Sequence, residues 1–200
     1  SLLAEEITAP GEEVRGLLTI CGNPVLSVPR GDKLREALGT LEFMVALDIY
    51  INETTSQADI ILPSTVHPEH SNVDVTFQNF TARNYISYSP RMFAPEGDLK
   101  DLGEIILEIA ARMAGLSRDD MEGFIYQGMV DMACKRAQQD GYPLDAATVN
   151  AQVTGDTPAE RYIDIMLRTG PYGDRFGARP EGLSLDAVKQ HPQASMDLGP

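Results

Sequence analysis

Cysteine is scarce in this sequence of 200 residues, and long apolar runs are missing. The two cysteines, Cys21 and Cys134, lie far apart and form no Cys-x-x-Cys pair, which argues against a disulfide framework and fits a reducing compartment. No apolar run approaches the ~18 residues needed to cross a bilayer, and no signal peptide is recognisable. We therefore expect a cytoplasmic protein with no membrane insertion.

Basic residues are also few. The sequence has 16 lysines and arginines against 30 aspartates and glutamates, which gives a formal net charge of −14. Such a surface repels phosphate backbones, so we expect no nucleic-acid partner, and it disfavours anionic membrane surfaces too. An anionic ligand would have to be held locally, by backbone amides and helix N-termini.

A Gly-rich phosphate fingerprint is absent, although the chain has the layout of a nucleotide-binding α/β unit. A strand buried on both faces is expected at 17–21, and it breaks at Gly22-Asn23-Pro24. A helix over 33–38, capped by Asp32, leads to a second strand that ends at Asp48. An intervening helix predicts parallel strands, and 58–62 is expected to be a third strand.

The rest of the sequence predicts a hairpin and then helices. Alternation at Val73, Val75 and Phe77, followed by 85–88, indicates an antiparallel pair. Helix starts are expected near Asp98 or Asp101, at Ser117 and at Thr157. Apolar stripes are predicted for these helices, a weak helix is expected over 183–190, and the last ten residues are expected to fray. The residues in the stripes are Leu102, Ile105, Ile106, Ile109, Met113, Phe124, Ile125, Met129, Met132, Ile163, Met166 and Leu167.

The predicted fold class is therefore α/β: a Rossmann-like, mostly parallel sheet with flanking helices, plus a helical C-terminal half. We expect a cofactor-binding α/β domain over 1–115 and a helical, loop-rich extension over 116–200 that packs on it.

Candidate binding residues lie where the first two strands end, because open α/β sheets bind ligands at the carboxyl ends of their strands. Gly22 would let backbone approach a ligand, Asn23 offers both donor and acceptor, and Ser27 lies within reach of a phosphate oxygen. The alternative is an ordinary strand-ending turn. A carboxylate at Asp48 could accept from ribose hydroxyls or from the guanine N1–H and amino group, or it could be a solvated acid or helix cap. Thr54 could bond a phosphate or ribose, or cap a turn.

Other polar residues favour structural roles. Asp59 is expected to tie down local backbone. His67, Glu69 and His70 lack the spacing of a zinc helix, and Pro68 disfavours a helix there, so no metal site is predicted. Cys21 and Cys134 are expected to be buried apolar residues.

Two stretches resemble the molybdopterin oxidoreductases of the dimethyl sulfoxide reductase family, which includes formate dehydrogenases and nitrate reductases. The first is Gly22-Asn23-Pro24, followed by Asp48 after the next strand. The second runs Glu53-Thr54-Thr55-x-x-Ala58-Asp59-Ile60-Ile61-Leu62-Pro63. The resemblance continues with an acidic residue, Glu69, and with a hairpin pattern formed by Thr76, Asn79 and Arg83. A later turn, Arg168 to Asp174, also resembles part of the family.

The resemblance implies an internal piece of the catalytic subunit of a molybdenum or tungsten oxidoreductase. The chain begins at Ser1 without an initiator methionine, which also suggests a piece of a longer protein. Within the parent, the resemblance implies binding of molybdopterin guanine dinucleotide, and Gly22, Asn23, Pro24, Ser27, Asp48 and Thr54 form the expected site. No catalytic residue is expected here, so the piece alone would be inactive.

Other parts of the parent would supply the metal ligand, an iron–sulfur cluster and the second cofactor-binding domain. The expected partners are these remaining domains and a redox partner subunit. The alternative function is a stand-alone, non-catalytic nucleotide-binding or interaction module, because fold alone does not fix function.

Overall fold

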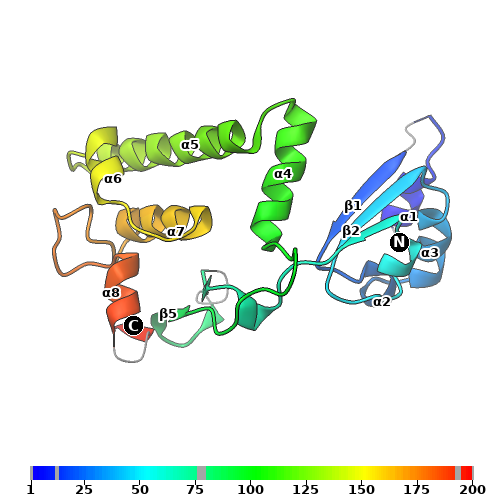
Figure 1. Cartoon of the computed structure of the whole chain (residues 1–200), viewed down its shortest axis with the longest axis horizontal. Helices are drawn as coiled ribbons and strands as arrows, with labels where there is room; N and C mark the ends of the chain where they lie inside the picture. Colours follow the sequence, from blue (N-terminus) through cyan, green and yellow to red (C-terminus); the bar gives the residue numbers. More distant parts are fainter. Residues whose placement is uncertain (1, 12–13, 76–79, 192–194, 200) are drawn as a thin grey trace. The chain divides into compact units, whose positions relative to one another are not determined.

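The computed structural model describes residues 2–11, 14–75, 80–191 and 195–199. Its contacts divide the chain into two compact units (Figure 1). One unit contains residues 1–69 and 94–105, and the other contains 70–93 and 106–200. Segment 70–93 thus belongs with the C-terminal helices by its contacts. The expected division of the chain at 115 stays a prediction.

A parallel sheet of three strands forms the first unit. Its strands are β1 (Gly16–Ile20), β2 (Phe43–Leu47) and β3 (Ile60–Leu62), in the order β1-β2-β3. The predicted α/β class is confirmed. Ile20 aligns with Leu47, and Leu47 with Leu62, so all three strands end at one edge of the sheet.

Helices α1 (Leu2–Ile7), α2 (Pro24–Ser27) and α3 (Gly31–Leu38) belong to the same unit. Figure 1 shows α1 and α3 on one side of β1 and β2. Their apolar side chains form the core with the sheet residue Met44. Its buried members are Ala4, Ile7, Val25, Leu34, Ala37, Leu38 and Met44.

The start of α3 differs from the prediction. The N-cap is Arg30, in the left-handed region at φ 61°, and Asp32 lies inside the helix, where it pairs with Arg30 at 3.2 Å. The tight junction with α2 explains the difference. A Cβ on Gly31 would lie 1.8 Å from the carbonyl oxygen of Val25, so only glycine fits where α3 begins.

Strand β1 is not buried on both faces, which corrects the prediction. Leu18 and Ile20 remain 40% and 44% exposed, because β1 is an edge strand and helices cover one face of the sheet. Cys21 is exposed as well, because it follows the strand at φ 48° in the turn. Cys134 is partly buried against an apolar cluster, in closer agreement with expectation.

Asp59 ties down backbone as predicted. Its carboxylate accepts a hydrogen bond of 2.7 Å from the amide of Met44, at the point where β3 meets β2. Two 3-10 turns, Thr55–Gln57 and His67–Glu69, flank β3.

In the second unit, β4 (Asn72–Val73), β5 (Asn84–Ser89) and β6 (Ser195–Gly199) form an antiparallel sheet. The predicted hairpin is confirmed by the pairing of β4 with β5, although Phe77 lies outside the described residues. The prediction of a frayed C-terminus is wrong, because β6 pairs along β5.

The described helices of this unit are α4 (Leu102–Ala114), which starts in the first unit, α5 (Arg118–Gln139), α6 (Ala146–Gln152), α7 (Pro158–Thr169) and α8 (Leu185–Gln190). All of them except α6 begin close to the predicted positions. The Ser117 and Thr157 side chains accept from the amides three residues ahead, as predicted. Helix α6, which was not expected, is capped by Asp145.

The predicted apolar stripes are partly wrong. On α5, Phe124 and Met132 are 75% and 67% exposed, while the smaller Val130, Ala133 and Ala137 are buried. The reason is close packing of α5 along α7, which Figure 1 shows and which small side chains permit. A similar shift exposes Met113 of α4, Ile106 and Met166, whereas Leu107 and Ala111 are buried.

Within the described residues, no helix combines the length and apolar character that crossing a membrane requires.

Candidate functional site

The carboxyl edge of the parallel sheet brings the main predicted residues together. β1 runs out through Cys21 and Gly22 into Asn23, and β2 runs out into Asp48. The amide of Cys21 donates to the carbonyl of Leu47 at 2.8 Å, which carries the β1–β2 pairing to the edge. Because the strands are parallel and end in register, the turn after β1 lies beside Asp48.

Thr54 connects this turn to the loop after β2. Its hydroxyl donates to Asn23 Oδ1 at 2.7 Å and accepts from the amide of Val25 at 3.0 Å. The residue is fully buried, at 0% exposure. Thr54 therefore acts by holding Asn23 and the start of α2, and its hydroxyl has no direct path to a ligand.

The side-chain amide of Asn23 donates to Glu53 Oε2 at 2.6 Å. Both functional ends of Asn23 are thus oriented by residues of the loop after β2. The amide has a second hydrogen and the carbonyl a second lone pair. Asn23 can therefore contribute to a ligand without giving up these bonds.

The loop after β2 is itself fixed by Asn52. The side-chain oxygen Oδ1 of Asn52 accepts from the backbone amides of Thr54 and Thr55, each at 3.0 Å. Asn52 Nδ2 donates to Asp48 Oδ2 at 3.0 Å. Asp48 Oδ1 accepts from the amide of Tyr50 at 3.1 Å. The carboxylate of Asp48 is therefore held in place, with acceptor capacity left on both oxygens.

The edge is rich in acceptors and negative potential. Burial, and then the charge of Asp48, raises the pKa of the Cys21 thiol. The Asn23 amide lowers the pKa of Glu53, so this carboxylate is ionised at neutral pH. Two carboxylates at one edge suit hydrogen-bond donors such as hydroxyl and amino groups, and they repel phosphate.

The other predicted site residues lie around this edge. Gly22 has an ordinary φ, and a Cβ there would meet only Ile20 O at 3.7 Å and Pro24 Cδ at 3.9 Å. The fold therefore does not require glycine at 22. Pro24 occupies the first turn of α2, as its fixed φ favours. Ser27 is exposed at the end of the same short helix.

Asn52 and Glu53 also belong to this site, although neither was predicted as a site residue. Both lie in the stretch between the two apolar strands, immediately before Thr54. The signal that could have identified them is the run of polar residues directly after a strand end that already carries Asp48.

Residues that continued the resemblance have local partners. Glu69 accepts from the amide of Val66 at 2.9 Å, and Arg83 pairs with Asp197 at 2.9 Å. Thr76 and Asn79 lie outside the described residues. Among the residues that the structure describes, no group of three or more His, Cys, Asp or Glu side chains is arranged to hold a metal ion.

The segment from Arg168 to Asp174 contains the end of α7 and the turn that follows it. Asp174 is buried and accepts from Arg168 at 2.9 Å and from the amide of Phe176 at 3.0 Å. A Cβ on Gly173 would lie 2.1 Å from the Arg168 carbonyl oxygen. These contacts explain the residue pattern without a ligand.

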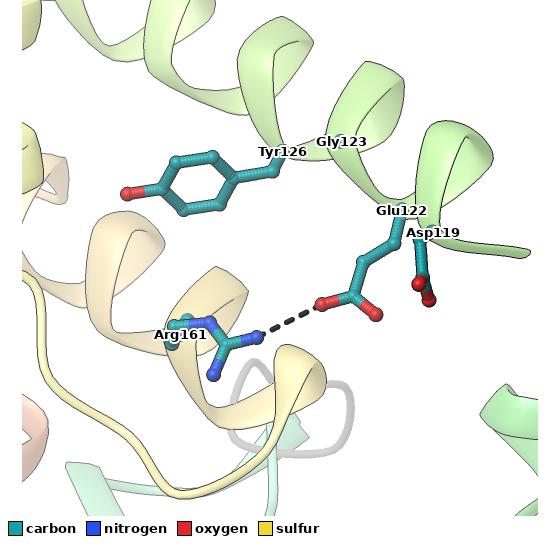
Figure 2. Close-up of a pocket in the computed structure, with 5 residues that line it drawn as sticks. All are labelled: Asp119, Glu122, Gly123, Tyr126 and Arg161. Carbon is teal, nitrogen blue, oxygen red and sulfur yellow. Dashed lines mark hydrogen bonds and ion pairs between the residues drawn. The ribbon is translucent and has the colours of Figure 1, made fainter.

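A separate hollow of about 310 Å³ lies on the second unit, between α5 and α7 (Figure 2). It is lined by Asp119, Glu122, Gly123, Tyr126 and Arg161. Arg161 and Glu122 form an ion pair of 2.9 Å, and the Tyr126 hydroxyl donates to Asn150. The polar groups of this hollow thus have partners within the chain, and the hollow is open to solvent.

Comparison with known proteins points to one family. A family model described as molybdopterin oxidoreductase matches residues 2–112. The probable oxidoreductase YyaE of Bacillus subtilis is 28% identical over 73% of this chain and 23% of its own length. The assimilatory nitrate reductase catalytic subunit of B. subtilis is 32% identical over 50% of this chain and 14% of its own length. Formate dehydrogenase H of Escherichia coli is 35% identical over 50% of this chain and 13% of its own length. The chain thus spans less than a quarter of each of these relatives.

Proposed function

Because this chain belongs to the molybdopterin oxidoreductase family, we propose that it is part of the catalytic subunit of a molybdenum or tungsten oxidoreductase, similar to formate dehydrogenases and nitrate reductases. Its contribution is to bind the guanine dinucleotide part of the molybdopterin cofactor at the carboxyl edge of the parallel sheet. The observation that carries this proposal is the fixed group of acceptors formed by Asn23, Asp48 and Glu53.

The chemistry of this edge favours one part of the cofactor over the others as the ligand. Ionised carboxylates accept hydrogen bonds from ribose hydroxyls and from the N1–H and 2-amino group of guanine. Adenine offers no such donor pair, so Asp48 would select guanine over adenine. The charge of Asp48, which after burial is the second cause of the raised pKa of Cys21, keeps phosphates away from this carboxylate. The nucleoside therefore fits this edge better than the pyrophosphate does.

Each predicted residue has a proposed role at this edge. Asp48 and Asn23 contact the nucleoside, and Thr54 positions Asn23 from inside the protein. Gly22 lets the ligand approach the backbone, which is a reason for glycine that the fold itself does not provide. Pro24 fixes the turn, and Ser27 lies one turn further along on the exposed side of α2.

The bound cofactor would supply the metal-centred two-electron chemistry, and this chain would bind and orient its nucleotide end. The metal ligand, an iron–sulfur cluster and the second half of the cofactor site would come from other domains of the parent, with a redox partner subunit beyond. We place the enzyme in the cytoplasm, in keeping with its sparse, unpaired cysteines.

The substitution Asp48→Asn tests this function. It keeps the size of the side chain and removes the charge, so it should weaken GDP binding by at least about tenfold, as loss of a charge-assisted hydrogen bond implies. Isothermal titration calorimetry of the unsubstituted chain and of the variant measures the change in GDP affinity. The matched control is Asp131→Asn, the same change on an exposed side chain of α5 in the other compact unit.

Equal GDP affinity in the Asp48→Asn variant and the unsubstituted chain would remove Asp48 from the site. An equal loss in the Asp131→Asn control would mean that net charge, and not the position of Asp48, controls binding. Circular dichroism of both variants checks that the fold is retained.

A further inference from the structure

Helix α5 is apolar on two opposite sides. One side, which includes Val130 and Ala133, is buried against α6 and α7. Phe124, Gly128 and Met132 follow one another at intervals of four residues, so they share the other side of the helix, which we call the outer face. Phe124 and Met132 are 75% and 67% exposed, and a Cβ on Gly128 would meet nothing within 4 Å. The described part of the chain therefore leaves the outer face uncovered.

An outer face of this composition is unusual for a helix that already packs on its own unit. The side opposite the buried stripe of such a helix normally carries polar and charged residues. On α5, two large apolar side chains flank a glycine, and Ile125 beside them is 36% exposed. Neighbouring apolar side chains on a surface mark an interaction site, and a glycine between them lets a second helix come close. The outer face is therefore suited to packing against another helix.

The charges along α5 indicate which helix suits this surface. Asp120 lies near the start of α5, and Lys135 and Arg136 lie near its end. A second α5 in the same direction would bring like charges together, whereas an antiparallel α5 brings each acidic start beside a basic end. The antiparallel arrangement also places opposite ends of the two helix dipoles side by side. A second copy of α5 is thus complementary in charge to the first.

The spacing of residues about Gly128 makes the match symmetric. Phe124 and Met132 lie four positions before and after Gly128, and Asp120 and Arg136 lie eight positions before and after it. A two-fold axis at Gly128 therefore places Phe124 against Met132 of the second copy. The same axis places Asp120 beside Arg136 of the second copy, and both contacts recur on the other side of the axis.

The contacts that these charged residues already make are compatible with the pairing. Asp120 accepts from the Ser117 hydroxyl at 2.6 Å and keeps acceptor capacity. Arg136 pairs with Asp140 at 3.9 Å, an exposed contact that contributes little. Lys135 forms no ion pair with any residue that the structure describes.

The total charge is also compatible with a second copy. The net charge of −14 is spread over the whole chain, and charges farther apart than about 8 Å are largely screened at physiological salt. The charges on α5 itself nearly cancel. They are Asp119, Asp120, Glu122 and Asp131 against Arg118, Lys135 and Arg136.

We propose that α5 forms an antiparallel contact with α5 of a second copy, so that the parent protein is a dimer with its two-fold axis at Gly128. A single pair of helices buries less area than a standard interface, so we expect the dimer to dissociate on dilution. This association does not depend on the nucleotide site at the edge of the sheet.

Sedimentation velocity of the full-length parent over a range of concentrations measures the association. Phe124→Glu places a carboxylate within the contact and should raise the dissociation constant of the dimer by at least about tenfold. Met92→Glu is the matched control, because Met92 is 73% exposed in the loop after β5 and the substitution adds the same charge. A monomer at all concentrations, or an equal effect of the two substitutions, would overturn the proposal. Circular dichroism of both variants checks that the fold is retained.

Photo-crosslinking tests the direction and register of the two helices. p-Benzoylphenylalanine replaces Phe124 in a mixture of ¹⁵N-labelled and unlabelled parent protein, and mass spectrometry locates the cross-linked peptides after irradiation. We expect peptides that join a labelled copy to an unlabelled one, with the attachment point on α5 near Met132. Cross-links only within one polypeptide would overturn the proposal, because another part of the parent would then cover the outer face. Cross-links to a second copy at positions outside α5 would overturn it as well.

Discussion

Replacing Thr54 by valine tests how the turn after β1 is held to the loop after β2. Valine keeps the shape of threonine and removes the hydroxyl. In the unsubstituted chain this hydroxyl donates to Asn23 Oδ1 at 2.7 Å and accepts from the Val25 amide at 3.0 Å, and the Thr54 side chain is fully buried. The substitution therefore leaves a donor and an acceptor without their partner.

The expected cost follows from these two bonds. A buried polar group that loses its partner costs about 1–3 kcal/mol, and the Val25 amide is the more buried of the two. We expect Thr54→Val to lower the free energy of unfolding by about 2–3 kcal/mol. The variant Thr54→Ser keeps the hydroxyl and loses one methyl group, so it should cost about 1 kcal/mol.

Urea unfolding followed by circular dichroism measures these values. With a slope of about 2 kcal/mol/M, the midpoint of Thr54→Val should fall by about 1 M. Thr40→Val is the matched control, because the Thr40 hydroxyl donates at the exposed end of α3. A cost for Thr54→Val no larger than that for Thr40→Val or Thr54→Ser would refute this account of the turn.

Three further predictions concern other parts of the structure. Gly31→Ala should lower the free energy of unfolding by about 3 kcal/mol, because the new Cβ would lie 1.8 Å from a carbonyl oxygen. In the control Gly128→Ala, on α5, the new Cβ would meet nothing within 4 Å, so the free energy of unfolding should rise by about 0.5–1 kcal/mol. Equal effects of the two substitutions in urea unfolding would contradict the close packing at the α2–α3 junction. Gly22→Ala should change stability by less than about 1 kcal/mol yet weaken GDP binding at least about tenfold, so unchanged affinity in calorimetry would remove Gly22 from the site. Burial raises the pKa of Glu160, but hydrogen bonds from Lys189, the Asp156 amide and Ser71 outweigh burial and bring the pKa from 4.5 to about 2. Because the pKa of Glu160 is lowered, the stabilisation by Glu160 is full above pH 4.5 and is lost as the pH falls towards 2. Glu160→Gln should therefore remove about 1–2 kcal/mol of the acid-dependent loss of unfolding free energy, and Glu36→Gln, on an exposed side chain of α3, is the matched control. The same pH dependence with and without Glu160→Gln would show that Glu160 contributes no such stabilisation.

The sequence was most informative where a local signal decides the structure. Three apolar runs ending at Gly22, Asp48 and Pro63 predicted the parallel strands, and Ser117 and Thr157 marked helix starts through side-chain caps. These features depend on residues within a few positions of one another. The sequence also predicted which sheet edge brings Asn23 and Asp48 together, because that follows from strand order.

Features that depend on distant contacts were not predictable. Strand β6 forms by pairing with β5, which lies more than 100 positions earlier in the chain, so its own residues seemed to be a frayed end. On α5, apolar residues occur on more than one side, and only packing against α7 selects Val130 over Met132. Thr54 showed the same limit, because its bond to Asn23 spans 31 positions and gives a buried positioning role to a residue expected to touch ligand.

The most direct test of the central claim is a GDP titration of the ¹⁵N-labelled chain, followed by nuclear magnetic resonance, with ADP as the control. We expect saturable chemical-shift changes of the Gly22, Asp48 and Glu53 amides with GDP, and markedly smaller changes with ADP. Equal shifts with both nucleotides, shifts confined to other residues, or no shifts at millimolar GDP would contradict a guanine-nucleotide site at the carboxyl edge of this sheet.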